Sequence, residues 1–165
     1  MTLRVAKIVL VASVALFYTV VAFNNLTDYG SNYQFVHHVL LMDTTFPGNH
    51  LMWRSIHVIG VQTVFYDGII AWEAVTAGLS WLGVYKLARV VRKPAADFNA
   101  GKRLPIAAVT MGLLLWLLAF ITVGGEWFLM WQSKIWNGQE AAFRMFTIIG
   151  IIFLLLIQPD VEGQP

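Results

Sequence analysis

The sequence of 165 residues contains no cysteine, and only 12% of its residues are charged. Without cysteine the chain cannot build a disulfide, a thiolate zinc site or an iron–sulfur cluster from its own residues. Soluble domains carry about 25% charged residues, and half that proportion is too little to cover the surface of a compact soluble protein. The scarcity of charge therefore indicates a chain whose surroundings are mostly hydrocarbon.

The sequence also lacks the local motifs of common enzymes. It has no phosphate-binding glycine loop, no zinc-protease motif and no serine nucleophile elbow. Its basic residues show no interleaved aromatic pattern of the kind that binds nucleic acid. We therefore predict no cofactor and no nucleic-acid partner, and we favour a non-enzymatic role.

Apolar residues, in contrast, make up 58% of the chain. They gather in four stretches, at about 8–23, 56–85, 105–128 and 143–157. A helix needs about 20 apolar residues to cross a bilayer core, and backbone groups in lipid must be hydrogen-bonded within their own segment. We therefore predict an all-α fold, a four-helix transmembrane bundle that forms one integral membrane domain over residues 1–165.

Lysine and arginine predict the orientation of the bundle. Most of the 11 basic residues lie in the N-terminal tail and in the loop 86–104. The positive-inside rule places this side in the cytoplasm. We predict a multi-pass protein of the bacterial cytoplasmic (inner) membrane with both termini cytoplasmic. A cleaved signal peptide is the alternative for residues 8–23, but the apolar run is long for that role.

Residues 24–55 form the predicted outer loop. Apolar residues recur at helical spacing from Asn32 to Met42, which predicts a short amphipathic helix on the membrane surface. Imidazole and carboxylate groups can bind zinc or copper, but the spacing of the histidines matches no metal motif. Metal ligation, and haem ligation likewise, are therefore minor alternatives to hydrogen bonding at the surface. All four histidines lie in or next to this loop: His37, His38, His50 and His57.

Two acids, Asp67 and Glu73, lie in the stretch 56–85, at a depth where ionisable groups are costly and usually functional. At about 100° per residue, Asp67 falls on a face of small residues, which favours close packing of membrane helices. We therefore expect Asp67 to point into the bundle and interpret it as structural. For Glu73, structural packing and proton or ion handling stay open. The small-residue face contains Gly60, Thr63, Asp67, Ala71, Ala74 and Gly78, and Glu73 shares a second face with Ser55, Gln62, Tyr66, Thr76 and Ser80.

The third stretch ends in the pair Gly124 and Gly125, which allows close backbone contact or a bend. Glu126 and Arg144 follow at similar predicted levels near the outer boundary. We predict an ion pair between them that closes the outer end of a helical hairpin. The alternative is that both line a site shared with the outer loop.

Several segments form a recurring signature: GGEWF at 124–128, MWQS at 130–133, WNGQ at 136–139 and AFR at 142–144, with NNLTDY at 24–29, FVHHV at 35–39 and MDT at 42–44. Together with Trp53, Arg54 and Glu73, they resemble a bacterial family of predicted small integral membrane proteins of unknown function. The resemblance covers nearly the whole chain and implies no activity. It implies that the outer loop, Glu73 and residues 124–144 belong to one shared feature. The further functional candidates are therefore Asn24, Asp28, His37, His38, Trp131, Gln132 and Asn137.

Three functions follow as hypotheses. The first is an accessory or binding component, which contacts the lipid bilayer and docks a larger membrane complex through its outer loop and tight helix faces. The second is a small proton- or ion-coupled transporter that uses Glu73 and Asp67. The third and least favoured is an enzyme or a metal-dependent redox protein that uses the outer histidines. The sequence shows no interrupted helix and no inverted repeat, which disfavours transport.

Overall fold

Every regular element in the described part of the chain is helical. The computed structural model describes residues 1–162 and contains no strand among them. This confirms the predicted all-α class. The helices are α1 (Thr2–Thr27), α2 (Tyr29–Leu41), α3 (Ile59–Val90), α4 (Ala95–Gly101), α5 (Arg103–Leu114), the π-helix η2 (Leu115–Trp127) and α6 (Gln139–Ile157), with short 3₁₀ turns η1 (Met52–Arg54) and η3 (Met130–Gln132).

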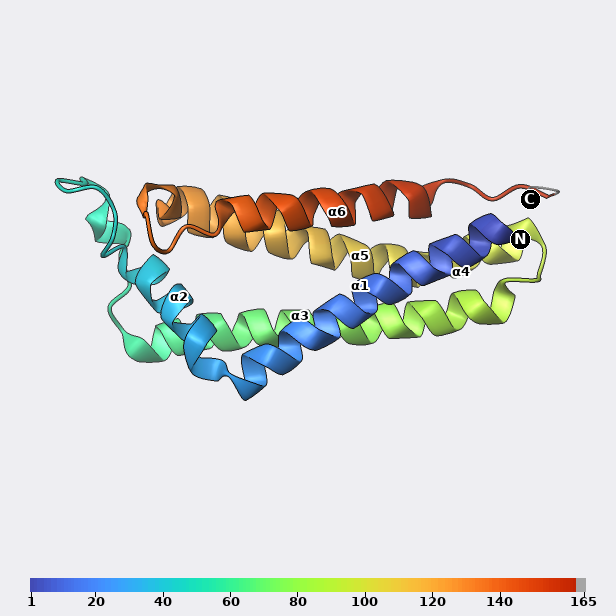
Figure 1. The fold of residues 1–165 in the computed structure, drawn as a ribbon, viewed down its shortest axis with the longest axis horizontal. Helices are drawn as coiled ribbons and strands as arrows, with labels where there is room; N and C mark the ends of the chain where they lie inside the picture. The colour runs from blue at the N-terminus through green and yellow to red at the C-terminus, as the bar shows by residue number, and fades with distance from the viewer. Residues whose placement is uncertain (163–165) are drawn as a thin grey trace.

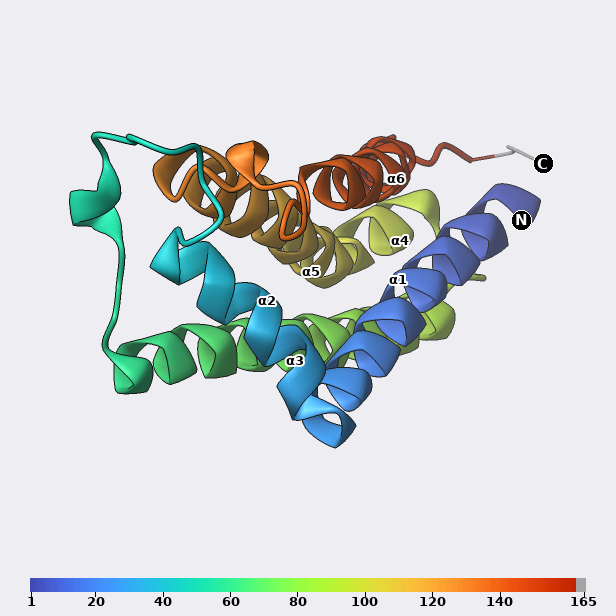
Figure 2. The same cartoon turned by 60° about the vertical axis from the view of Figure 1, so that its left-hand side comes forward.

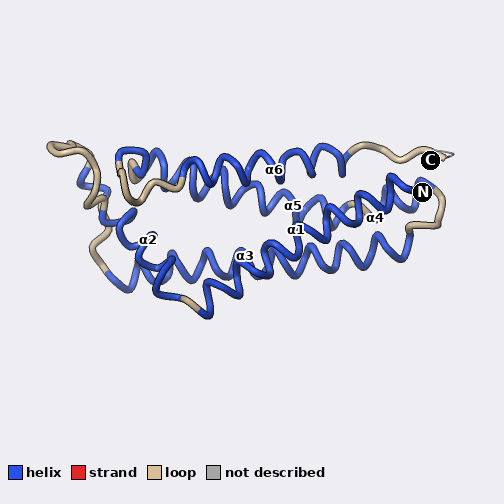
Figure 3. The backbone as a smooth tube through the Cα atoms, in the orientation of Figure 1, coloured by secondary structure: helices blue, strands red, loops and turns tan. Residues whose placement is uncertain are grey.

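The long helices run side by side along the long axis of the molecule (Figure 1). α1 packs across α3, while α5 and its continuation η2 form one rod that packs on α6. α2 turns back from the end of α1 and lies between the α1–α3 pair and η2 (Figure 2). Loops gather at the two ends of the molecule (Figure 3).

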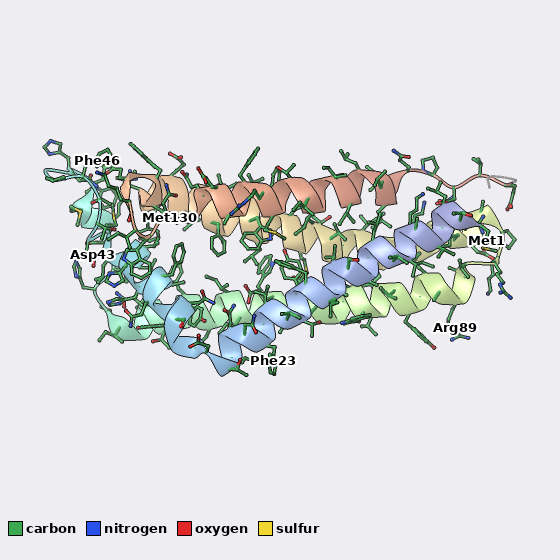
Figure 4. All side chains as sticks on the ribbon, viewed as in Figure 1. Met1, Phe23, Asp43, Phe46, Arg89 and Met130 are labelled. Atoms are coloured by element: carbon green, nitrogen blue, oxygen red, sulfur yellow. The ribbon has the colours of Figure 1, made fainter. Side chains whose placement is uncertain are left out.

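The two ends differ in composition. Met1 and Arg89 lie at one end, and Asp43, Phe46 and Met130 lie at the other (Figure 4). We call the first the basic end, which comprises residues 1–7, 86–104 and 158–162. We call the second the cap, which comprises residues 42–58 and 128–138. The N-terminal tail, the basic loop and the C-terminal tail therefore lie on the same side of the bundle.

Three helical segments are long and apolar enough to cross a membrane: Thr2–Thr27, Ala95–Trp127 and Gln139–Ile157. α3 is not among the segments that qualify within residues 1–162, although it has 32 residues. α3 is therefore long enough to cross a membrane but not apolar enough to qualify, because one of its faces is polar. The structure supports three of the four predicted spans, and we return to the fourth below.

The helices extend beyond the apolar stretches that predicted them. α1 has 26 residues and takes in both Lys7 and Asn25, which are buried by contacts with other parts of the chain. The helix predicted inside the outer loop is α2. Its Val39 and Leu40 are buried, and it packs on α3, so these side chains contact protein.

Of the two faces of α3 that carry an acid, the structure buries only the face with Glu73. Asp67 is exposed, and a Cβ built on Gly60 or Gly78 would have no neighbour within 4 Å. The expectation that Asp67 points into the bundle is therefore wrong. Polar groups at membrane depth need partners on neighbouring helices, and this need outweighs the packing advantage of small residues. The polar face is the buried one, with exposures of 0–3%: Gln62, Tyr66, Glu73, Thr76 and Ser80.

Apolar side chains form two separate cores. The larger core joins α1, α3, α5 and α6, and includes Val11, Tyr18 and Ile149. The smaller core lies under the cap and joins α2 to the segment after η2, through residues such as Leu40 and Met130. The candidate functional site lies between the two cores.

Candidate functional site

The central residue of the site is Glu73, in the middle of α3. Its side chain is 3% exposed. Oε2 of Glu73 accepts a hydrogen bond from Nδ2 of Asn25 at 2.7 Å, and Oδ1 of Asn25 accepts one from Nδ2 of Asn32 at 2.5 Å. This chain of polar contacts joins α3 to the end of α1 and the start of α2.

A cavity of about 270 Å³ opens beside Glu73, and we call it the Glu73 chamber. Among the described residues that line it, none is a lysine, arginine or histidine. The buried carboxyl group therefore faces no cation. The lining residues are Val21, Asn25, Asn32, Phe35, Val36, Tyr66, Ile69, Glu73, Trp116, Phe120, Gly138 and Ala141.

Tyr66 supplies a second polar group to the chamber. The residue is 1% exposed, and its hydroxyl has no hydrogen-bond partner among residues 1–162. Tyr66 precedes Glu73 by two helical turns, which corresponds to a rise of about 10 Å along α3. A buried hydroxyl without a partner costs roughly 1–3 kcal/mol. The chamber thus holds two polar groups, the Glu73 carboxyl and the Tyr66 hydroxyl, that can form further hydrogen bonds to a bound molecule.

An apolar groove of about 240 Å³ continues from the chamber. Four residues, Phe35, Val36, Ile69 and Phe120, line both. The rest of the groove contains only apolar side chains and Gly124: Val39, Leu40, Phe65, Leu118, Ala119, Val123 and Phe128. Phe65 and Leu118 are 43% and 51% exposed, so the groove reaches the side of the bundle between α3 and η2.

The wall opposite α3 is the π-helix η2, which has 13 residues. The Thr122 hydroxyl donates to the carbonyl oxygen of Leu117 at 2.8 Å, five residues earlier. π-Helices are rare, occur mostly as single turns, and are frequent at functional sites. The wider winding places Trp116 and Phe120 on the chamber and Val123 on the groove.

The chamber draws together the three parts of the chain that the sequence signature had grouped. Asn32 and Phe35 come from the segment predicted as outer loop, Glu73 from α3, and Gly138 and Ala141 from the stretch 124–144. Over residues 3–159, the sequence matches the family described as "Predicted small integral membrane protein (DUF2165)". The chain belongs to this family.

No curated protein and no solved structure matches this small integral membrane protein. The family establishes membrane integration and agrees with the three apolar helices. It describes no reaction, so the assignment of roles to residues depends on the geometry of the chain itself.

A buried ionic cluster closes the basic end of the membrane protein. Nζ of Lys7 lies 2.8 Å from Oδ2 of Asp160, and Nζ of Lys102 contacts the same oxygen. All three side chains are 2–4% exposed. Both lysines also donate to the carbonyl oxygen of Gln158, at 2.8 Å from Lys7 and 2.6 Å from Lys102. The cluster fastens α1, the α4–α5 corner and the C-terminal tail to one another.

The cluster perturbs the acidity of Asp160. Burial by itself would raise the pKa of its carboxyl, but the hydrogen bonds and positive charges of Lys102 and Lys7 outweigh burial and lower the pKa. Asp160 is therefore ionised in the folded protein. Burial also lowers the pKa of Lys102, and the neighbouring Lys7 adds to this shift while Asp160 opposes it.

Several signature residues hold the cap together at a distance from the chamber. Oε1 of Gln132 accepts a hydrogen bond from the backbone amide of Phe46 at 2.9 Å, and Oδ1 of Asn137 accepts one from the amide of Gln139 at 3.0 Å. Trp131 is exposed and contacts Phe46 edge-on, with ring centroids 5.7 Å apart. Trp131 and Gln132 thus join η3 to the cap loop at Phe46, and Asn137 contacts the first residue of α6.

The histidines make hydrogen bonds to protein groups. His37 pairs with Oε1 of Gln62 at 2.6 Å. His38 pairs with Oδ2 of Asp43 at 2.7 Å and stacks on Trp136. Within residues 1–162, no three side chains of the types His, Cys, Asp and Glu come together in a way that could hold a metal ion. His50 is exposed in the cap loop.

The remaining acidic and basic candidates are exposed. Among the described residues no ion pair joins Glu126 to Arg144, so the predicted pair is wrong. Glu126 lies at the end of the widened η2 and Arg144 lies more than a turn into α6. Asp67 accepts a hydrogen bond from the Tyr29 hydroxyl at 2.8 Å. Asn24 and Asp28 are exposed at the α1–α2 corner, where Asp28 accepts from Ser31.

Sequence reasoning missed Asn25, Asn32 and Tyr66 in the chamber, and Lys7, Lys102 and Asp160 in the cluster. Tyr66 carried a usable signal, because it lies two turns from Glu73 on the polar face. Lys7 and Asp160 carried none, since they meet across almost the whole length of the chain.

Proposed function

We propose that this protein is a binding component of the membrane that holds an amphipathic, lipid-like molecule between α2, α3 and η2. The observation that carries the proposal is Glu73, a buried carboxyl in a chamber that shares four lining residues with an apolar groove. Ionisable groups at membrane depth are expensive and persist mostly for function. A polar chamber joined to an apolar groove matches the two parts of an amphiphile, and the exposed Phe65 and Leu118 mark an entrance from the bilayer.

The proposal includes α3 as the fourth membrane span. Most of the polar residues that lower its hydropathy face the interior of the bundle, while Val64, Val75 and Leu82 are exposed on its outer side. The exception is Asp67, which is exposed and accepts a hydrogen bond from the Tyr29 hydroxyl. Lipid would therefore contact a mainly apolar surface. With α3 as a span, the basic end faces the cytoplasm by the positive-inside rule. Both termini are then cytoplasmic, and in a bacterium the host membrane is the inner membrane.

Docking to a larger membrane complex is a second candidate, and a separate observation favours it. The small-residue face of α3 is exposed, and Gly60, Gly68 and Gly78 have open space where a Cβ would project. Such a face permits close approach of another membrane helix. An accessory role and amphiphile binding are compatible, because the face and the groove involve different sides of α3.

Transport of protons or ions through Glu73 has less support. Beyond Glu73 towards the basic end, the buried polar residues of α3 are Thr76 and Ser80, and the larger apolar core surrounds that region. A proton path needs a continuous series of titratable groups or waters. The described residues provide no such series between Glu73 and the lysine cluster.

The test is to identify what the protein retains from the membrane. We expect the protein purified in mild non-ionic detergent to carry a small amphiphile, detected by mass spectrometry after solvent extraction. Ala119→Trp places an indole in the groove and should abolish retention. Ala107→Trp, at an exposed position of α5 that lines neither groove nor chamber, is the matched control and should retain it. Equal retention by both variants would refute the proposal.

A further inference from the structure

We infer that the polar head of the bound amphiphile is an ammonium group, which pairs with Glu73 while the apolar chain lies in the groove. This inference depends on the amphiphile-binding function proposed above. It adds the charge of the ligand, which groove shape alone does not determine.

The electrostatics of the chamber select the sign of the head group. The polar side chains that line it are Asn25 from α1, Asn32 from α2, Tyr66 and Glu73 from α3, and Trp116 from η2, whereas α6 contributes only Gly138 and Ala141. Glu73 is the single titratable acid among them, and none carries positive charge. The chamber offers a phosphate or carboxylate head no cation to pair with, so anionic lipids are disfavoured.

Hydrogen bonding points to a donor as the missing partner. Asn25 occupies Oε2 of Glu73, and no hydrogen bond within the described chain reaches Oε1. The Trp116 indole is already used, because its Nε1 donates to the Tyr18 hydroxyl at 2.9 Å. An ammonium group brings three donors and a positive charge, so it can engage Oε1 of Glu73 and still donate to a second acceptor. The Tyr66 hydroxyl is available as one.

A neutral alcohol or carbonyl head would satisfy hydrogen bonds but could not form an ion pair with Glu73. Charge-assisted hydrogen bonds are about twice as strong as neutral ones, and more so where water is excluded. We therefore expect the chamber to distinguish an amine from an alcohol of equal chain length. One additional charge-assisted hydrogen bond corresponds to an affinity for the amine about tenfold higher than for the alcohol.

The experiment compares three probes with the same alkyl chain: dodecylamine, dodecanol and dodecanoate. Their binding to the full-length protein in non-ionic detergent is measured near neutral pH by equilibrium dialysis, with protein-free micelles as the blank. We expect the amine to bind about tenfold more tightly than either other probe. Glu73→Gln should remove this preference. Glu126→Gln, which removes an equal charge from an exposed position, should retain it.

The outcomes separate the two proposals. If dodecanol binds as well as dodecylamine, or if the amine preference survives in Glu73→Gln, the ammonium inference is wrong and amphiphile binding stands. If none of the three probes binds the wild-type protein, both fail. Glu73→Asp keeps the carboxylate and provides a second readout should Glu73→Gln misfold: the amine preference should persist in it, and its loss would count against the inference.

Discussion

Neutralising Asp160 should destabilise the protein more than any other single change at the basic end. Asp160→Asn leaves Lys7 and Lys102 buried side by side without an anion. Removing one partner of a buried ion pair costs about 3–5 kcal/mol, because the remaining charge is uncompensated. Here two charges remain, so the loss should reach that range. For a chain of this size, 1 kcal/mol corresponds to roughly 2–4 °C in Tm, so we expect a drop of about 6–20 °C.

The assay is thermal unfolding in detergent, followed by near-ultraviolet circular dichroism. Lys7→Gln leaves the Lys102–Asp160 pair with balanced charge, so its loss should be smaller, about 1.5–3 kcal/mol for the hydrogen bonds removed. Asp97→Asn is the control at an exposed position of the same end, where about 0.3–1 kcal/mol of helix-dipole interaction is at stake. A Tm for Asp160→Asn close to that of Asp97→Asn, or a larger loss in Lys7→Gln, would refute the reasoning.

The same cluster predicts a direction of pH dependence. The pKa of Asp160 is lower in the folded protein than its ordinary value of 3.8. A carboxyl group whose pKa is lower in the folded than in the unfolded protein stabilises the fold. This stabilisation is fully present when the pH is above the pKa of the unfolded state, and it is lost as the pH falls through the pKa of the folded state. The wild-type protein should therefore lose stability on acidification below about pH 3.8 through this group, whereas Asp160→Asn should lack that component.

Two further predictions concern the interior and use the same unfolding assay. Glu73→Gln should leave Tm unchanged or raise it, because the amide oxygen can still accept from Asn25 and a buried ionisable group is removed. A clear fall in Tm would indicate that the carboxyl group is structural. Gly112→Ala should lower the free energy of unfolding by about 1–3 kcal/mol, because the added Cβ would lie 2.8 Å from the Tyr18 hydroxyl. Gly78→Ala is the control, since a Cβ there would project into open space, and it should be neutral or stabilising. Equal effects of the two substitutions would contradict the packing described for α1 and α5.

Hydropathy predicted where the helices lie but not which faces they bury. A long apolar stretch in lipid must be helical, because no water is available to satisfy the backbone, and this constraint needs no tertiary information. The inward face of α3 is a different problem. Small residues and polar residues both signal helix contacts in a membrane. Only the positions of α1, α2 and η2 show that the polar face, with Glu73, is the one they cover.

The candidate site was predictable only in its central residue. Glu73 stands out because an acid at membrane depth needs an explanation. Its partner Asn25 was assigned to the outer loop, since polar residues after an apolar run usually end a helix at the membrane boundary, whereas α1 continues to Thr27. The π-helical winding of η2 has no signal in its amino acids, so the faces of Trp116 and Phe120 could not be predicted.

The most direct test of the account is the sidedness of the two ends of α3, since the chamber requires α3 to cross the bilayer within the bundle. The natural chain has no cysteine, so single cysteines can be introduced at His50 in the cap and at Lys93 in the basic loop, both exposed. With a membrane-impermeant maleimide on intact bacterial cells, we expect labelling of His50→Cys and none of Lys93→Cys until the membrane is opened. Identical labelling of both positions before opening would show that α3 does not cross, and would contradict the account.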